Sequence, residues 1–472
     1  MSHTVRITEA SPRLADLKLS WSTPIFTDDD GIGSLASLHQ AGDAFVAVVR
    51  FTAEGPVVLG SGVMVGPGLV ITATHVLDEF RAAGASPVFM TFLPEGARAW
   101  LPLDISAGSR PSAFDPHRMV TSDLSLVSCT LNSDPMEERP LGLAPLKVGL
   151  PLIGDRLWAI GFRHQDISGS AARVSPMISS GLVTQAFPTG RGDRMSAACF
   201  EVDMETIGGM SGGAVVDVDG NLVGIVSSSL EGGPSYMTLI WDALGLRVKG
   251  PTPRLSLQPT ITLLGAQSWW VVRIKGDVER NPWGEITVHF SQDEARLLTV
   301  SAPDAFPDDG RRQLTADERM AFMDEHGGEL ESLATEAVID WLEGLPLDHV
   351  YAFLGAAQVP ADLFPGLSGF EIEDMEGAED LELITAREGS DGSLEIAFFL
   401  RLQSYVWILE MPSAFAEAHA EALEAHFINI ETEGGETRME RVQRAYFRAT
   451  TRFDRTDGTF GEISVTSSAV IP

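Results

Sequence analysis

The sequence has few cysteines and no long apolar run. Its 472 residues include only two cysteines, Cys129 and Cys199, whereas small secreted domains usually carry several disulfides. We therefore expect two buried free thiols. No stretch of eighteen consecutive apolar residues occurs, and the first residues lack the basic and apolar segments of a signal peptide. These absences argue against a secreted or membrane-spanning chain and predict a cytoplasmic location.

Positive charge is also scarce. The chain has 33 Lys and Arg against 66 Asp and Glu, for a net charge of −33. Residues 1–250 carry a net charge of −9, and residues 251–472 carry −24. Because an acidic field repels phosphate groups, we expect neither nucleic acid nor a membrane as a partner. The acidity of the C-terminal half fits either a basic regulatory protein partner or a solvated surface kept for solubility.

Several cofactor motifs are missing. The sequence contains no Cys and His cluster with metal-ligand spacing, no P-loop and no dinucleotide-binding fingerprint. We therefore expect neither a metal nor a cofactor. A hydrophobic content of 44% with 21% charged residues is typical of a folded chain, and the length favours two or three domains.

Much of the N-terminal half alternates apolar and polar residues in short runs, among them AFVAVVRF, GLVITATH, LSLVSCTL and RLWAIGF. Period-two alternation between turn residues is typical of an all-β domain. Asp219, Gly220 and Asn221 predict a hairpin turn, because glycine readily adopts a positive φ. We expect this all-β domain over residues 35–246, after an N-terminal extension of residues 1–34.

The second half has a different pattern. Residues 247–260, RVKGPTPRLSLQPT, gather proline and basic residues and predict a linker. Residues 261–472 predict an acidic α+β region of one or two subdomains. The runs SWWVVRIKG, GEITVHF and ARLLTV predict strands, and a helical tract follows, with Thr315 and Glu318 as its capping box. Further strands (LELITA, SLEIAFFLRL, YVWILEM), a helix and the strand-like FGEISVTSS complete the chain.

Three motifs carry the residues of one catalytic chemistry. GLVITATHVL places His75 after a hydrophobic strand, SDLSLVSC sets Asp123 at the start of another, and GGMSGGAVVD puts Ser211 in a glycine-rich turn. A serine hydroxyl becomes a nucleophile when an imidazole takes its proton, and a carboxylate fixes the tautomer of that imidazole. We therefore predict a catalytic triad of His75, Asp123 and Ser211.

The aspartate has rivals in Asp104, Asp115 and Asp134. Asp123 is preferred because it heads an alternating strand between the other two members of the triad.

Glycines flank the predicted nucleophile. Gly209 lets the backbone curl so that its N–H and that of Ser211 point at one place, which predicts an oxyanion hole. Each such donor typically contributes about 3 kcal/mol to stabilising the transition state. Gly212 and Gly213 keep the space beyond Ser211 open.

The order His, Asp, Ser, within TATH, SDLSLV and GMSGG, resembles the trypsin-like (chymotrypsin-fold) serine protease superfamily. The stretch GDRLWAIGF, then SSGLVTQ and VDMETIGGMSGGAVVDVDGNLVGIVSSS, is similar to bacterial HtrA-like and related intracellular trypsin-like peptidases. The resemblance covers residues 35–245. It implies two six-stranded β-barrels with the triad between them, acting on a protein or peptide substrate.

The same resemblance implies substrate contacts. Glu205 lies six residues before Ser211, where trypsins place the acid that selects Arg or Lys, although a different loop path would leave Glu205 exposed. Ser235 would line the same pocket. Three serines would form an edge strand that pairs with the substrate backbone: Ser227, Ser228 and Ser229.

Two departures from the resemblance matter for regulation. Met210 stands where digestive trypsins have the Asp that pairs with a newly cut N-terminus, so activation by that ion pair is not expected. No PDZ domain of the HtrA type is evident after residue 250.

Three functions are therefore compared. The first is a serine endopeptidase with a regulatory or substrate-recruiting C-terminal half, of a kind that suits bacterial stress or antiviral systems. The second is a catalytically silent double barrel that acts as a binding module, against which the intact triad argues. In the third, the C-terminal half is a sensor whose ligand releases the protease.

Overall fold

The computed structural model describes residues 18–21, 33–34, 42–53, 55–94, 96–111, 119–166, 176–192, 195–229, 233–252, 255–280, 286–306, 311–389 and 391–471. The chain divides into two compact units. The first contains residues 1–280 and 286–308, and the second contains residues 281–285 and 309–472. Within the described ranges, no helix combines the length and apolar character needed to span a membrane.

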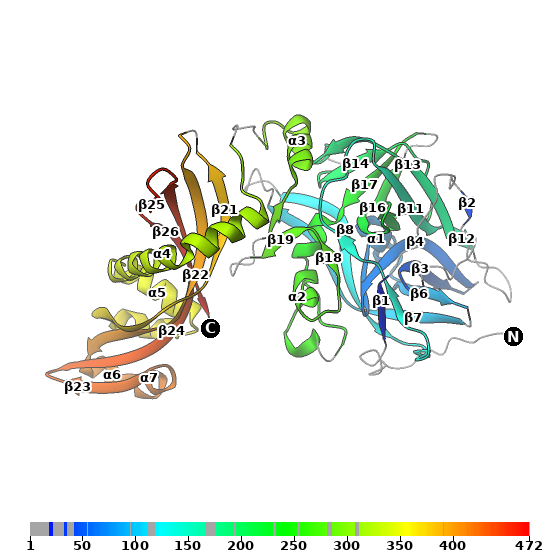
Figure 1. Cartoon of the computed structure of the whole chain (residues 1–472). Helices are drawn as coiled ribbons and strands as arrows, with labels where there is room; N and C mark the ends of the chain where they lie inside the picture. The colour runs from blue at the N-terminus through cyan, green and yellow to red at the C-terminus, as the bar shows by residue number, and fades with distance from the viewer. Residues whose placement is uncertain are drawn as a thin grey trace. The chain divides into compact units, whose positions relative to one another are not determined.

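The first unit begins with a closed antiparallel barrel of six strands, in the hydrogen-bonded order β4-β3-β6-β7-β8-β5 and back to β4 (Figure 1). Apolar residues recur along each strand because each strand lines a common interior of Val, Leu, Ile and Phe side chains. The strands are β3 (Phe45–Thr52), β4 (Gly55–Gly66), β5 (Leu69–Ala73), β6 (Val88–Leu93), β7 (Gly96–Pro111) and β8 (Met119–Leu131).

A second antiparallel barrel closes in the order β15-β11-β13-β14-β17-β16 and back to β15. The two barrels confirm the expected all-β double-barrel fold. The predicted hairpin joins β15 to β16, and Gly220 has a φ of +75° in its turn. The six strands are β11 (Arg156–Phe162), β13 (Pro176–Phe187), β14 (Cys199–Val202), β15 (Ala214–Val216), β16 (Leu222–Ser229) and β17 (Ser235–Leu239).

Short elements extend these barrels. Part of the predicted N-terminal extension pairs with the unit, since β1 bonds to β9 and β2 bonds to β13. Cys129 and Cys199 are buried and unpaired thiols, as expected. The short elements are β1 (Leu19–Trp21), β2 (Gly33–Ser34), α1 (Thr74–Ala82), β9 (Leu141–Leu143), β10 (Leu146–Lys147), β12 (Gln165–Asp166) and η2 (Ile240–Gly245).

The division between the units differs from the predicted linker at residues 247–260. Val248 and Leu255, from that segment, are buried in the core of the first unit, together with Leu263 and Val272 beyond it. SWWVVRIKG was expected to be a strand, but α2 (Leu263–Ser268) ends inside it and only β18 (Ile274–Lys275) pairs, with β10. The prolines and glycine of this segment mark turns on the barrel surface, where apolar residues still reach the core.

The prediction of a strand at ARLLTV is wrong, because the segment lies in helix α3 (Gln292–Ser301). Ser291 and Glu294 form a capping box at its start. Glu294 also accepts a hydrogen bond from Leu150 N at 2.7 Å, and Leu298 is buried in the core of the second barrel. The first unit therefore ends with α3 packed on its second barrel.

The second unit is a six-stranded sheet with helices and one hydrophobic core, which fits the predicted α+β region. The long helix α4 lies across the sheet in Figure 1 and has the predicted capping box of Thr315 and Glu318. The strands are β21 (Gly369–Glu388), β22 (Leu394–Pro412), β23 (Ile428–Glu433), β24 (Glu436–Asp454), β25 (Thr459–Phe460) and β26 (Ser464–Ile471). The helices are α4 (Ala316–Glu343), α5 (Leu347–Ala356), η4 (Ala361–Gly366), α6 (Ser413–Ala418) and α7 (Ala420–His426).

Three further elements belong to the first unit. They are η3 (Leu255–Leu257), β19 (Asp277–Arg280) and β20 (Ile286–His289).

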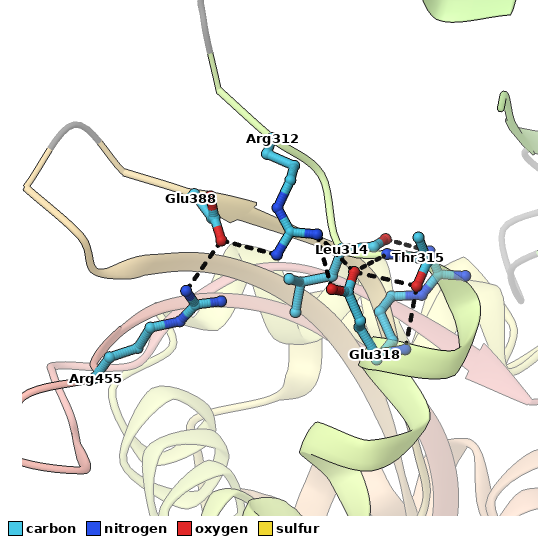
Figure 2. Close-up of polar contacts among 7 residues, drawn as sticks. Arg312, Leu314, Thr315, Glu318, Glu388 and Arg455 are labelled. Atoms are coloured by element: carbon cyan, nitrogen blue, oxygen red, sulfur yellow. Dashed lines mark hydrogen bonds and ion pairs between the residues drawn. The ribbon is translucent and has the colours of Figure 1, made fainter. Parts of the chain in front are cut away.

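Arginines tie the first described segment of this unit to its sheet. Figure 2 shows Arg312 between Glu318 and Glu388, with N···O distances of 2.8 and 3.0 Å. Glu388 also binds Arg455 at 3.0 Å. Leu314 N donates to the carbonyl of Ala386, so backbone and side chains hold this segment against β21 together.

Candidate active site

His75 and Asp123 are brought together by strand pairing. Strands β5 and β8 are antiparallel, with Ala73 opposite Leu124, so the residues just beyond that pair lie side by side. His75 lies in the first turn of α1 rather than in an open turn. Its Nδ1 is 2.9 Å from Asp123 Oδ2, and its backbone N–H donates to Asp123 Oδ1 at 3.0 Å.

A further donor holds the carboxylate. Ser227, in β16, donates from Oγ to Asp123 Oδ2 at 2.6 Å, and its own hydroxyl is 2.7 Å from Thr238 Oγ1. With Asp123 accepting from Nδ1–H, the other ring nitrogen of His75, Nε2, is left as the proton acceptor. The sequence resemblance implied only a substrate-binding role for Ser227, whereas its side chain orients the aspartate.

The surroundings of His75 favour its protonated form. Burial disfavours the imidazolium and lowers the pKa of His75, but the hydrogen bond and negative charge of Asp123 outweigh it. Glu79 and Asp78, on the same helix, add to this effect, so the pKa of His75 is raised above its ordinary value of 6.5.

The rival aspartates lie elsewhere. Asp104 accepts hydrogen bonds from the backbone N–H groups of Ile105 and Lys249, and Asp134 accepts from Met136 N. Asp115 lies outside the described residues.

Ser211 lies in the turn between β14 and β15, and Gly212 brings it to the first barrel. Gly212 has a φ of +79°, and a Cβ there would lie 2.3 Å from Ser61 O and 2.8 Å from Ala73 N. The chain beside Ser211 therefore packs directly against the backbone that leads into His75. In the described part of the chain, no hydrogen bond joins the Ser211 hydroxyl to His75, and such bonds are often long before substrate binds.

The loop before Ser211 has each of its peptide planes fixed. The carbonyls of Gly208 and Met210 accept hydrogen bonds from His164 N at 2.7 Å and from Gly213 N at 2.8 Å. Carbonyl and N–H point in opposite directions in a trans peptide, so the N–H groups of Gly209 and Ser211 point away from these partners. Among the described residues neither N–H group has an acceptor. An oxyanion hole needs two free donors close together, and here only Met210 separates them in the sequence.

Residues that sequence reasoning missed hold this loop. The peptide between Gly209 and Met210 is bound at both ends, by Ser61 Oγ to the carbonyl at 2.7 Å and by Ile207 O to the N–H at 3.0 Å. Gly209 itself needs to be glycine, because its φ is +95° and a Cβ would lie 2.1 Å from His164 N. Ser61 carried no signal, since its partners are far away in the sequence.

Met210 is fully buried in the core of the second barrel. At this position digestive trypsins have the Asp that pairs with a new N-terminus, and the sequence predicted that this chain lacks that ion pair. Apolar packing therefore anchors the loop that an ion pair anchors in digestive trypsins.

The predicted substrate-binding serines lie at the end of β16. The end of β16 pairs with β17, with Ser228 opposite Tyr236 and Ser229 opposite Ser235. Its pairing with β15 stops at Ile225, so within the described residues the second edge of this strand end has no strand beside it. Ser228 is exposed, and the Ser229 side chain lies outside the described residues.

Of the residues predicted to line the selectivity pocket, the buried one, Ser235, carries no charge. Ser235 is fully buried, lies 2.8 Å from Thr206 Oγ1 and donates to Met204 O at 2.9 Å. Glu205 is exposed. An exposed carboxylate does not match an acid at the closed base of a pocket. In the described part of the chain, no group of His, Cys, Asp and Glu has the arrangement of a metal site.

Comparison with known proteins adds the family. A trypsin-like peptidase domain model matches residues 60–225, which span His75, Asp123 and Ser211. Residues 60–225 are a trypsin-like peptidase domain. No curated protein matches the chain.

Three solved structures are similar to part of this chain. Human heparin binding protein is 16% identical, with a TM-score of 0.32, over 45% of this chain and 91% of its own. The Rv3671c protease in its inactive form is 13% identical (TM-score 0.28), over 42% of this chain and 84% of its own. The MamO protease domain from Magnetospirillum magneticum is 19% identical (TM-score 0.30), over 43% and 95%. These similarities support no conclusion about activity.

Proposed function

We propose that the protein is a serine endopeptidase in which His75, Asp123 and Ser211 form the catalytic triad. One observation carries this proposal: the loop of residues 208–211 has its carbonyls bound and leaves the N–H groups of Gly209 and Ser211 free beside the Ser211 side chain. A binding module has no need of two N–H groups left without a protein acceptor at that place, since most backbone donors in a folded chain are paired.

The proposed reaction has two stages. Ser211 Oγ attacks the substrate carbonyl carbon while His75 Nε2 takes the hydroxyl proton, and Asp123 stabilises the imidazolium. The carbonyl oxygen becomes an oxyanion that accepts hydrogen bonds from Gly209 N–H and Ser211 N–H. His75 then gives its proton to the leaving amine, the C–N bond breaks and an acyl-enzyme on Ser211 remains. Water, deprotonated by His75, hydrolyses the acyl-enzyme.

A fluorophosphonate probe tests the proposal, because it reacts with an activated serine and not with an ordinary one. The full chain should form a covalent adduct at Ser211, located by mass spectrometry of the digested protein. Ser211→Ala should abolish the adduct and peptide hydrolysis, and His75→Ala should lose comparable activity, since nucleophile and base act as a unit. An intact, folded protein without an adduct would leave the alternative, a catalytically silent scaffold.

For the second unit we propose a regulatory or substrate-recruiting role toward a basic partner. Residues 309–472 carry 33 Asp and Glu against 11 Lys and Arg, a net charge of −22, and the described part of this unit contains no second copy of the His75 arrangement. A cavity of about 580 Å³ lies between α4 and the turn after β24, with Phe322 and Phe453 among its apolar walls. Three acids, Glu318, Glu325 and Asp457, line it beside one arginine, Arg455. These features suit an aliphatic side chain that ends in a positive charge.

Cleavage assays test the role of this unit. Full-length protein and a chain of residues 1–308 should cleave a short peptide and candidate basic proteins at different relative rates, with the difference reduced at high salt. Identical rates on every substrate would show that the second unit neither regulates nor recruits. A role in bacterial stress or antiviral defence stays a prediction.

A further inference from the structure

We propose that Ser61 is a positioning residue whose hydroxyl holds the oxyanion loop in its working geometry. The inference rests on the proposed peptidase function and assigns a role to a residue of the first barrel. Ser61 lies in β4 and is fully buried.

The Ser61 hydroxyl accepts one hydrogen bond and donates another. Its Oγ accepts from Phe162 N at 2.8 Å and donates to Gly209 O at 2.7 Å. It thereby joins the end of β11 to the oxyanion loop, two segments of the second barrel. The Ser61 hydroxyl is thus a bridge that the first barrel supplies to the second.

The backbone of Ser61 is engaged as well. Its N–H donates to Ser211 O at 2.8 Å, and its carbonyl accepts from Thr72 Oγ1 at 2.6 Å. These bonds persist when the side chain is shortened to alanine. Ser61→Ala therefore removes the Oγ bridge alone and leaves the main-chain contact with Ser211 in place.

The bridge acts on the peptide that lies between the two oxyanion donors. Without Oγ, the carbonyl of Gly209 and the N–H of Phe162 lose their buried partner, and such groups seek new ones. The peptide of residues 209–210 is then held only by the bond from Met210 N–H to Ile207 O, and tilting about that bond moves the flanking N–H groups of Gly209 and Ser211. Because these donors act on the developing oxyanion, the loss falls on the transition state more than on substrate binding.

Steady-state kinetics of the full-length protein test the role, with Ser128→Ala as the matched control. Ser128 is a fully buried serine of β8 in the same barrel, and it contacts neither Gly209 nor Ser211. We expect Ser61→Ala to lower kcat about tenfold, less than the loss of a whole oxyanion donor, with KM within about twofold. The midpoint of the acidic limb of the pH–rate profile should not move, because His75 and Asp123 are untouched.

A second variant guards against a folding defect. Ser61→Cys keeps the size of the side chain but has a weaker donor, so its kcat should lie between those of the wild type and Ser61→Ala. Binding of a peptide aldehyde, which forms an oxyanion at the site, should weaken in step with kcat. If the wild type labels at Ser211 but both Ser61 variants match Ser128→Ala in kcat and aldehyde affinity, the role of Ser61 is overturned and the proposed function stands. A wild type without labelling would instead overturn the proposed function.

Discussion

Asp123 binds His75 at two points, the ring Nδ1 at 2.9 Å and the backbone nitrogen at 3.0 Å. The double contact fixes both the position of the helix start and the ring orientation. Asp123→Asn should lower kcat on the order of 10⁴-fold, because the amide donates where the carboxylate accepts and favours the wrong tautomer. Peptide hydrolysis measures the loss, and circular dichroism controls for folding. A loss below about tenfold would contradict the assignment of Asp123.

The pH dependence of activity follows from the raised pKa of His75. Only the neutral imidazole accepts the Ser211 proton, so kcat/KM should rise with pH along an acidic limb whose midpoint lies above 6.5. Removing nearby charge in the double variant Asp78→Asn and Glu79→Gln should move the midpoint down. A wild-type midpoint at or below 6.5 would contradict this.

The raised pKa of His75 also makes the folding stability depend on pH. The folded state binds the His75 proton more tightly than the unfolded state, so this contribution to stability is fully present below the unfolded pKa. It is lost as pH rises through the folded pKa. Urea unfolding at several pH values, with His75→Ala as reference, measures it.

Selectivity for a basic side chain should depend little on Glu205. Because this carboxylate is exposed, a charge pair with a substrate Arg would contribute at most about 1 kcal/mol. Glu205→Gln should therefore change kcat/KM for Arg and Lys substrates less than about fivefold, with apolar substrates as the control. A far larger loss confined to Arg and Lys substrates would show that Glu205 selects them.

The buried ion pair of the first barrel should matter more for stability than any surface pair. Asp43 and Arg98 are both fully buried, and Asp43 also accepts from Gly142 N. Asp43→Asn should cost about 3–5 kcal/mol of unfolding free energy, since it leaves the Arg98 charge uncompensated. The control Asp78→Asn breaks the exposed pair with Arg81 and should cost less than about 1 kcal/mol. Equal losses in urea unfolding would contradict this.

The boundary of the first unit also makes a prediction. A chain of residues 1–308 should unfold cooperatively and label with fluorophosphonate. A chain of residues 1–250 lacks Leu298 and the Glu294 contact with Leu150, so it should melt at a lower temperature. Equal melting temperatures would show that residues 251–308 add nothing to the stability of the barrels.

The double barrel was predictable because local patterns encode it, and the motifs also pointed to the pair of His75 and Asp123, which lie in contact. Alternation marks the strands, and each motif combines a strand end with small residues. The bonds of Ser61 were not predictable, since its hydroxyl joins residues 101 and 148 positions away. Such contacts depend on how the barrels pack, which no local pattern records.

Two errors in the second half have local causes. ARLLTV ends in two strand-forming residues, Thr299 and Val300, but its first four residues favour a helix, and Ser291 and Glu294 supply a capping box before it. The turn-forming residues of 247–260 were interpreted as a linker because polarity and proline hide the two residues, Val248 and Leu255, that reach the core.

The burial of Met210 simplifies the interpretation of kinetic data. From Thr206 to Val216 the chain contains no ionisable side chain, and a thioether in an apolar core neither titrates nor responds to ionic strength. In trypsins the corresponding ion pair adds a second protonation event, that of the N-terminal amine. We therefore expect the pH–rate profile of the proposed peptidase to lack the alkaline loss of activity that deprotonation of such an amine would cause.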